Sequence, residues 1–166
     1  MYTRHEESRA VISASPERVF GALDDHTRLS SHMSKSSWQM GGGKMDIIVD
    51  AGQGRRVGSH IVLRGRVFGV QLFVEEVVTT HEPPMNKVWE TIGTPRLLVI
   101  GPYRMSFALR ETGGNAALRV AIDYELPARG IARVLGLLFG RTYARWCTRR
   151  MVTDAARMFA AEPPVA

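Results

Sequence analysis

The stretch Gly130–Ala161, GIARVLGLLFGRTYARWCTRRMVTDAARMFAA, decides the fold of this chain. It predicts one long closing helix, roughly 45 Å at ~1.5 Å per residue, which begins after Pro127 ends a strand. Apolar residues at helical spacing predict the buried stripe of this helix: Leu135, Phe139, Tyr143, Cys147, Met151, Ala155, Met158 and Phe159. Gly136 and Gly140 lie near this stripe and permit a close approach, or leave room for a ligand. A helix of this kind needs a large apolar partner, and the rest of the chain offers a sheet.

The residues before this helix are typical of strands in one antiparallel sheet. Turns rich in glycine or proline separate seven segments: Glu7–Ala14, Trp38–Val49 interrupted by Gly41–Gly43, Gly58–Phe68, Val70–Thr79, Asn86–Ile92, Leu97–Arg110 and Ala116–Leu126. In the last two segments, apolar residues alternate with charged ones, so one face of the sheet is expected to be buried and the other to be exposed to solvent. Between Val70 and Ile92 a register error of one residue would exchange the two faces.

A pair of short helices is predicted between the first two strands. Ser15-Pro16 supplies an N-cap and a first-turn proline, and Val19, Phe20 and Leu23 share one face. A second short helix is expected at Arg28–Met33.

Composition narrows the class of protein. The 166 residues predict one domain at 1–162 and a short tail at 163–166. There is no stretch long enough to span a membrane and no signal-like N-terminus, so a cytoplasmic location is expected. Cys147 is the single cysteine and excludes an internal disulfide; mid-helix on the apolar stripe, it is expected to be buried and inert.

The net charge of +6 comes almost entirely from arginine and favours acidic partners or simple solubility. The closing helix carries Arg133, Arg141, Arg145 and Arg149 on the face opposite its apolar stripe. This face lacks the interleaved aromatic residues of single-strand binders, so nucleic acid is not expected. A solvated face is favoured, with a transient anionic membrane contact through Arg141, Arg145 and Arg149 as the second choice.

Other motifs have ordinary explanations. Gly41–Lys44 fails the spacing of a phosphate-binding loop. The five histidines have no metal-ligand spacing, so neither a metal nor another cofactor is expected. Asp24-Asp25 suits capping or solvation better than acid–base work, and Glu75 and Glu90 suit a surface charge lattice better than an inward pair.

On several segments the chain resembles the SRPBCC (START-like) superfamily, which includes polyketide cyclases and dehydrases, lipid-transfer domains and the birch-pollen-allergen family. The segments are AVISASPERVFGALDDHTRLSSHM (Ala10–Met33), GSHIVLRGRVFG (Gly58–Gly69), Glu75 with Glu82-Pro83-Pro84, KVWETIG (Lys87–Gly93) and RTYARW (Arg141–Trp146). The resemblance implies an α+β helix-grip fold, in which a curved antiparallel sheet of about seven strands wraps around the long C-terminal helix. It also implies an apolar cavity between sheet and helix, and it supplies no universal catalytic motif.

Three functions follow as hypotheses for a monomer or homodimer. The first is a carrier of a hydrophobic molecule (lipid, sterol, quinone or polyketide-like), with a wall drawn from Trp38, Ile61, Leu63, Trp89, Tyr103, Phe107, Tyr124, Leu135, Phe139, Tyr143, Cys147 and Met151. The second is a cyclase or dehydrase without metal, whose candidate catalytic residues are His32, Glu90 and Tyr143. The third is a protein-interaction module that uses the basic helix face.

Overall fold

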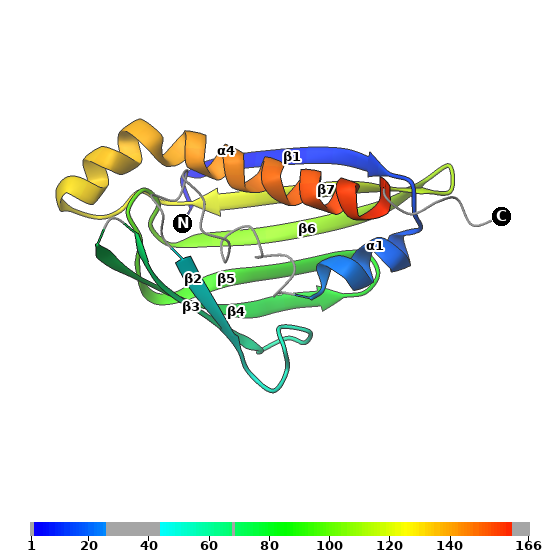
Figure 1. Ribbon diagram of the computed structural model, residues 1–166, viewed down its shortest axis with the longest axis horizontal. Coiled ribbons are helices and arrows are strands. Elements are labelled where there is room, and N and C mark those ends of the chain that lie inside the picture. Colours follow the sequence, from blue (N-terminus) through cyan, green and yellow to red (C-terminus); the bar gives the residue numbers. More distant parts are fainter. Residues whose placement is uncertain (1, 26–43, 68, 161–166) are drawn as a thin grey trace.

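The computed structural model describes residues 2–25, 44–67 and 69–160 (Figure 1). Within them, seven strands form one antiparallel sheet in the order β1-β7-β6-β5-β4-β3-β2. The strands are β1 (Arg4–Ile12), β2 (Lys44–Val49), β3 (His60–Val67), β4 (Val70–Glu82), β5 (Asn86–Arg96), β6 (Tyr103–Thr112) and β7 (Asn115–Tyr124). The chain runs through β2 to β7 as a meander, and β1 returns to pair with β7. The expected α+β architecture is confirmed.

The sheet has an inner face that packs against the helices and an outer face that meets solvent. In β6 and β7 the alternate residues from Tyr103 to Leu109 and from Leu118 to Tyr124 are buried, as the alternation predicts. Aromatic rings fill the centre of the inner layer: Phe107 lies edge-on to Phe20, with ring centroids 5.3 Å apart, and to Trp89, with centroids 6.3 Å apart. Each such buried side chain contributes about 1.5–3 kcal/mol through the hydrophobic effect.

Helix α1 (Pro16–Leu23) begins where the sequence predicts. Ser15 is extended, Pro16 occupies the first turn, and Val19, Phe20 and Leu23 are buried against the sheet. The predicted second short helix at Arg28–Met33 and the predicted strand residues 38–40 lie outside the described residues.

Helix α4 (Gly130–Ala160) packs along β1 and β7 (Figure 1). None of the helices in the described ranges is both long enough and apolar enough to cross a membrane. The buried face of α4 consists of Gly136, Gly140, Ala144, Cys147, Thr148, Met151, Val152 and Ala155. The predicted stripe is therefore confirmed from Cys147 to Ala155, met in part at Leu135 and Tyr143, which are partly buried, and wrong at Phe139, which is 53% exposed.

Two glycines explain why the first half of α4 turns a different face to the core. A Cβ atom on Gly136 would lie 2.9 Å from the carbonyl oxygen of Val99, and one on Gly140 would lie 2.8 Å from the same oxygen. The helix backbone packs directly against the loop that contains Val99, so only glycine fits at these two positions. Of the two roles that the sequence suggests for these glycines, close approach is confirmed.

The loop beneath these glycines, residues 97–102, differs from the strand start that the sequence predicts at Leu97. Instead β5 continues past Gly93 to Arg96, and residues 97–102 connect β5 to β6 beneath α4. Ile100 is buried, and the backbone N–H of Gly101 donates to the carbonyl oxygen of Glu125 over 2.8 Å. The loop therefore fills the space between the sheet and the first half of α4.

This packing predicts opposite effects for the same substitution in two helices. Gly140→Ala should destabilise the protein by about 1–3 kcal/mol, because the added methyl group meets the Val99 carbonyl. Gly21→Ala in α1, where a Cβ has no neighbour within 4 Å, should stabilise the protein by up to about 1 kcal/mol through helix propensity. Denaturant unfolding of both variants measures the difference. Equal shifts in the same direction would contradict the close approach.

Candidate functional site

Four titratable side chains gather on the inner face of the sheet and the facing side of α4. We call Glu76 (β4), Tyr103 (β6), Tyr143 and Cys147 (both α4) the inner polar cluster. The Tyr103 phenol donates a hydrogen bond to Oε1 of Glu76, and both residues are buried, with exposed fractions of 7% and 3%. The strands bring them together because inward residues alternate with outward ones in both β4 and β6.

The helix supplies the other half of the cluster. Tyr143 and Cys147 are four residues apart, one helical turn, so their side chains lie close enough to interact. Burial raises the pKa of Cys147 to about 12. The charge of a Cys147 thiolate, followed by burial, raises the pKa of Tyr143 well above its usual value.

Burial and the nearby carboxylate of Glu76 raise the pKa of Tyr103 well above its usual value. At neutral pH both phenols and the thiol therefore keep their protons. The cluster can donate hydrogen bonds into an otherwise apolar layer, but it contains no thiolate nucleophile.

Glu76 is the residue that the sequence analysis missed. The two glutamates that the sequence singles out, Glu75 and Glu90, both lie on the outer face: Glu75 Oε1 lies 3.0 Å from Nδ1 of His60, and Glu90 Oε2 lies 3.9 Å from Nε of Arg104. The favoured surface charge lattice is confirmed for them. The signal for Glu76 was its phase, because it lies on the same face of β4 as Leu72, Val74 and Val78, which are all buried.

The candidate residues separate into several groups. Those that are buried on the inner face or on α4 are Ile61, Leu63, Trp89, Tyr103, Phe107, Tyr124, Cys147 and Met151. Leu135 and Tyr143 are partly buried, and Phe139 is exposed. Trp38 and His32 lie outside the described residues. Among the catalytic candidates that the structure describes, Tyr143 lies in the inner polar cluster and Glu90 does not.

A second ionic group joins the end of α1 to the sheet; we call Asp24, His81 and Lys87 the Asp24 cluster. The Lys87 side chain has 0% exposure, and its Nζ donates to Oδ1 of Asp24 over 2.8 Å. His81 Nε2 lies 3.0 and 3.1 Å from the two carboxylate oxygens of Asp24. Asp24 occupies the C-cap position of α1, as the expected capping role has it, but its carboxylate is an ion-pair partner with 13% side-chain exposure and not a solvated group. Burial lowers the pKa of Lys87, and the bond to Asp24 opposes this shift.

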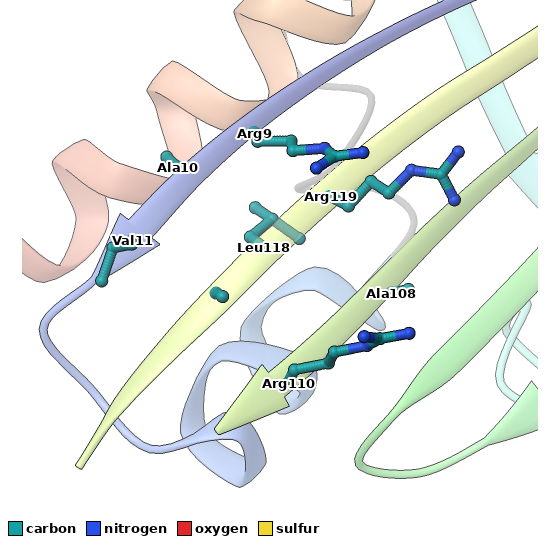
Figure 2. A pocket seen from close by; sticks show the side chains of 8 residues that line it. Arg9, Ala10, Val11, Ala108, Arg110, Leu118 and Arg119 are labelled. Atoms are coloured by element: carbon teal, nitrogen blue, oxygen red, sulfur yellow. The ribbon is translucent and has the colours of Figure 1, made fainter. Parts of the chain in front are cut away.

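The outer face of β1, β7 and β6 carries an open groove of about 560 Å³ (Figure 2). It is lined by Arg9, Ala10, Val11, Ala108, Arg110, Ala117, Leu118 and Arg119. Small alanines form its floor between long arginines. Glu7 holds two of these arginines, with Oε1 2.6 Å from Nη2 of Arg9 and Oε2 2.6 Å from Nε of Arg119. This single carboxylate offsets one of the three positive charges that the arginines bring to the groove.

The same carboxylate predicts a local acid sensitivity. Hydrogen bonds from Arg119 first, then from His5 and Arg9, lower the pKa of Glu7 from 4.5 to about 2. The stabilisation is therefore complete above pH 4.5 and is lost as the pH falls towards 2. Glu7→Gln should cost about 1 kcal/mol or less at neutral pH, and wild type and variant should converge in acid.

Denaturant midpoints across this pH range test the prediction, with Glu111→Gln, an exposed glutamate at the end of β6, as the control. A difference that stays constant down to pH 2 would contradict the assignment to Glu7.

In the described ranges, no three or more His, Cys, Asp or Glu side chains converge to hold a metal ion. The inner polar cluster brings titratable side chains of the sheet and of α4 together.

Comparison with known proteins places the fold. No protein-family model and no curated protein matches the sequence. Three examples illustrate the solved structures that are similar over most of this chain. The protein TTHA0849 from Thermus thermophilus has a TM-score of 0.67 at 14% identity, covering 95% of this chain and 98% of that one. Ara h 8.0201 has a TM-score of 0.65 at 10% identity, covering 96% and 99%. The di-domain ARO/CYC protein BexL from the BE-7585A biosynthetic pathway has a TM-score of 0.59 at 16% identity, covering 96% of this chain and 51% of that one.

Proposed function

We propose that this chain, which has the helix-grip fold of the SRPBCC (START-like) superfamily, binds a hydrophobic small molecule between the inner face of its sheet and α4. The observation that carries the proposal is the inner polar cluster. A buried carboxylate and two phenols are costly in an apolar layer unless they serve as hydrogen-bonding groups. Their position between sheet and helix suits the orientation of one polar end of an otherwise apolar ligand.

The surrounding wall supplies the affinity in this proposal. Ile61, Leu63, Trp89 and Phe107 are buried apolar residues of the inner face. Removing apolar ligand surface from water contributes about 25 cal/mol per Å². The protonated phenol of Tyr143 would donate to an oxygen of the ligand, and the phenol oxygen of Tyr103, whose single proton goes to Glu76, would accept from a ligand hydroxyl group. This arrangement favours a lipid, sterol, quinone or polyketide-like molecule with a carbonyl or hydroxyl group.

Native mass spectrometry of the protein purified from its own host, followed by solvent extraction, tests the proposal. We expect an adduct whose extracted mass belongs to one of these classes. An empty protein would argue against carriage, and would favour either a substrate that is turned over or a closed core.

An enzyme of the cyclase or dehydrase type is the second candidate, favoured by the Tyr103–Glu76 hydrogen bond. A phenol joined to a carboxylate forms a short path along which a proton can move to or from a bound polyketide-like chain. Glu76→Gln keeps the acceptor for Tyr103 and removes the acid. Loss of turnover with retained ligand binding in this variant would support catalysis, and unchanged turnover would exclude this path.

A transient contact with an anionic membrane through Arg141, Arg145 and Arg149 belongs to the same proposal. All three side chains are exposed on α4. Such a contact would give an apolar ligand a route into the protein that avoids water.

A further inference from the structure

The first half of α4 exposes large apolar side chains to water. Ile131, Val134 and Leu138 are 78%, 54% and 66% exposed, and their spacing places them on one side of the helix, facing away from the loop that Gly136 and Gly140 contact. Leu137 and Phe139 flank them, at 55% and 53% exposure. We call these five residues the apolar ridge. Contiguous exposed apolar residues of this kind mark interaction sites in soluble domains.

The ridge lies at an end of the molecule. Figure 1 shows the first half of α4 reaching past the strands β1 and β7, on which its second half packs. There it lies over residues 97–102 instead of over the sheet. The ridge is therefore a convex surface, one helix wide, suited to insertion into a soft medium.

The charged residues of the segment that carries the ridge are all positive. Residues 129–150 contain six arginines and no aspartate, glutamate or lysine. Arg141 pairs with Glu6 and Arg150 with Asp154, while Arg129, Arg133, Arg145 and Arg149 are exposed. On the same outer side, Trp146 lies with Arg145, Arg149 and Arg150 along a shallow groove. Apolar tip, tryptophan and arginines thus follow one another along a single helix.

We propose that α4 docks on an anionic lipid bilayer, with the apolar ridge inserted at the boundary between headgroups and acyl chains and the arginines against lipid phosphates. Helices that lie in a membrane interface combine an apolar side with flanking cations and aromatic residues. A second copy of this chain is a poor occupant, because two ridges in contact would bring two arginine-rich segments together. The inference rests on the membrane contact proposed above and adds the element that inserts.

Flotation with lipid vesicles tests the docking. The wild-type protein should float with mixed phosphatidylcholine–phosphatidylglycerol vesicles, remain unbound with pure phosphatidylcholine vesicles, and be released by high salt. Ile131→Asp and Leu138→Asp should each lower partitioning roughly tenfold, because each removes one inserted apolar side chain and adds a like charge to the lipid. Val11→Asp is the matched control: Val11 is 64% exposed on β1, at the outer-face groove, and its change should leave partitioning unaltered.

The outcomes separate the two levels of the proposal. If Arg145→Glu abolishes flotation and Leu138→Asp does not, the arginine contact stands and insertion of the ridge is overturned. If the wild-type protein fails to float at low salt, both are overturned. If Leu138→Asp instead dissolves a dimer seen by sedimentation velocity and the vesicles bind nothing, the ridge joins two copies and the membrane inference is wrong. Thermal unfolding of each variant establishes that it is folded.

Discussion

Replacing Asp24 with alanine is expected to destabilise the protein by about 3–5 kcal/mol, because it leaves the ammonium group of Lys87 buried without its counter-ion. Lys87 has 0% side-chain exposure and cannot recover its hydration without local unfolding. His81 loses the same carboxylate partner. Since Asp24 ends α1 and the other two residues lie on β4 and β5, the damage should reach the contact between this helix and the sheet. Denaturant unfolding at neutral pH measures the effect.

A double-mutant cycle with Lys87→Met separates a buried charge from a lost contact. If the cost comes from the unpaired ammonium, adding Lys87→Met to Asp24→Ala should restore about half or more of the lost free energy of unfolding. An apolar side chain of similar length can be buried at that position without a counter-ion. The salt bridge between Arg55 and Asp25, 3.9 Å apart and partly exposed, offers a matched control. Asp25→Ala should cost about 1 kcal/mol or less. Equal costs at Asp24 and Asp25 would contradict the buried-charge explanation.

Replacing Tyr143 with tryptophan is expected to abolish ligand retention while leaving the protein folded. The larger indole would occupy the space beside Cys147 that the proposal gives to the ligand, and it would remove the phenol that the proposal uses as a hydrogen-bond donor to the ligand. Overpacking at one position costs about 1–3 kcal/mol, which a domain of this size survives. The ligand extracted per mole of purified protein should fall at least tenfold, by the loss of about 1.4 kcal/mol or more of binding free energy.

Tyr2→Trp is the control for this experiment. Tyr2 is partly exposed, and its ring lies 5.2 Å from the guanidinium carbon of Arg104, whose side chain belongs to the outer face. The same chemical change there should leave the extracted ligand unchanged. Undiminished ligand in the Tyr143 variant would remove this residue from the wall and move the proposed site elsewhere on the inner face.

The alternation of apolar and charged residues predicted most of the fold, because side chains in a strand with one solvent-exposed face alternate between buried and exposed every two residues. It was enough for β6 and β7, where it identified both faces correctly. The helical spacing of apolar residues was likewise enough to end the closing helix within one residue of the observed position. These features depend on local periodicity, which a sequence displays directly.

The features that failed depend on contacts between distant residues. Phe139 fits an apolar stripe, but the carbonyl of Val99 admits only the glycine face of α4 at that level. Lys87 and Glu76 are charged residues in the phase of buried ones, and burial of each requires a partner that the sequence cannot identify: Asp24 for the lysine and Tyr103 for the glutamate. Polar groups of the interior are therefore the part of this site that only the folded arrangement discloses.

The pairing of β1 with β7 has a consequence for how the protein folds while it is being synthesised. His5 and Asp123, joined by a hydrogen bond across these strands, are 118 residues apart along the chain. Strand β1 must therefore wait until β7 has been synthesised before it can pair, and α4, which packs over both strands, is made later still. Such long-range closure slows folding to milliseconds or seconds in domains of this kind. During that wait the apolar inner faces of the completed strands remain uncovered, so the nascent chain offers chaperones a longer period of access than the mature protein ever does.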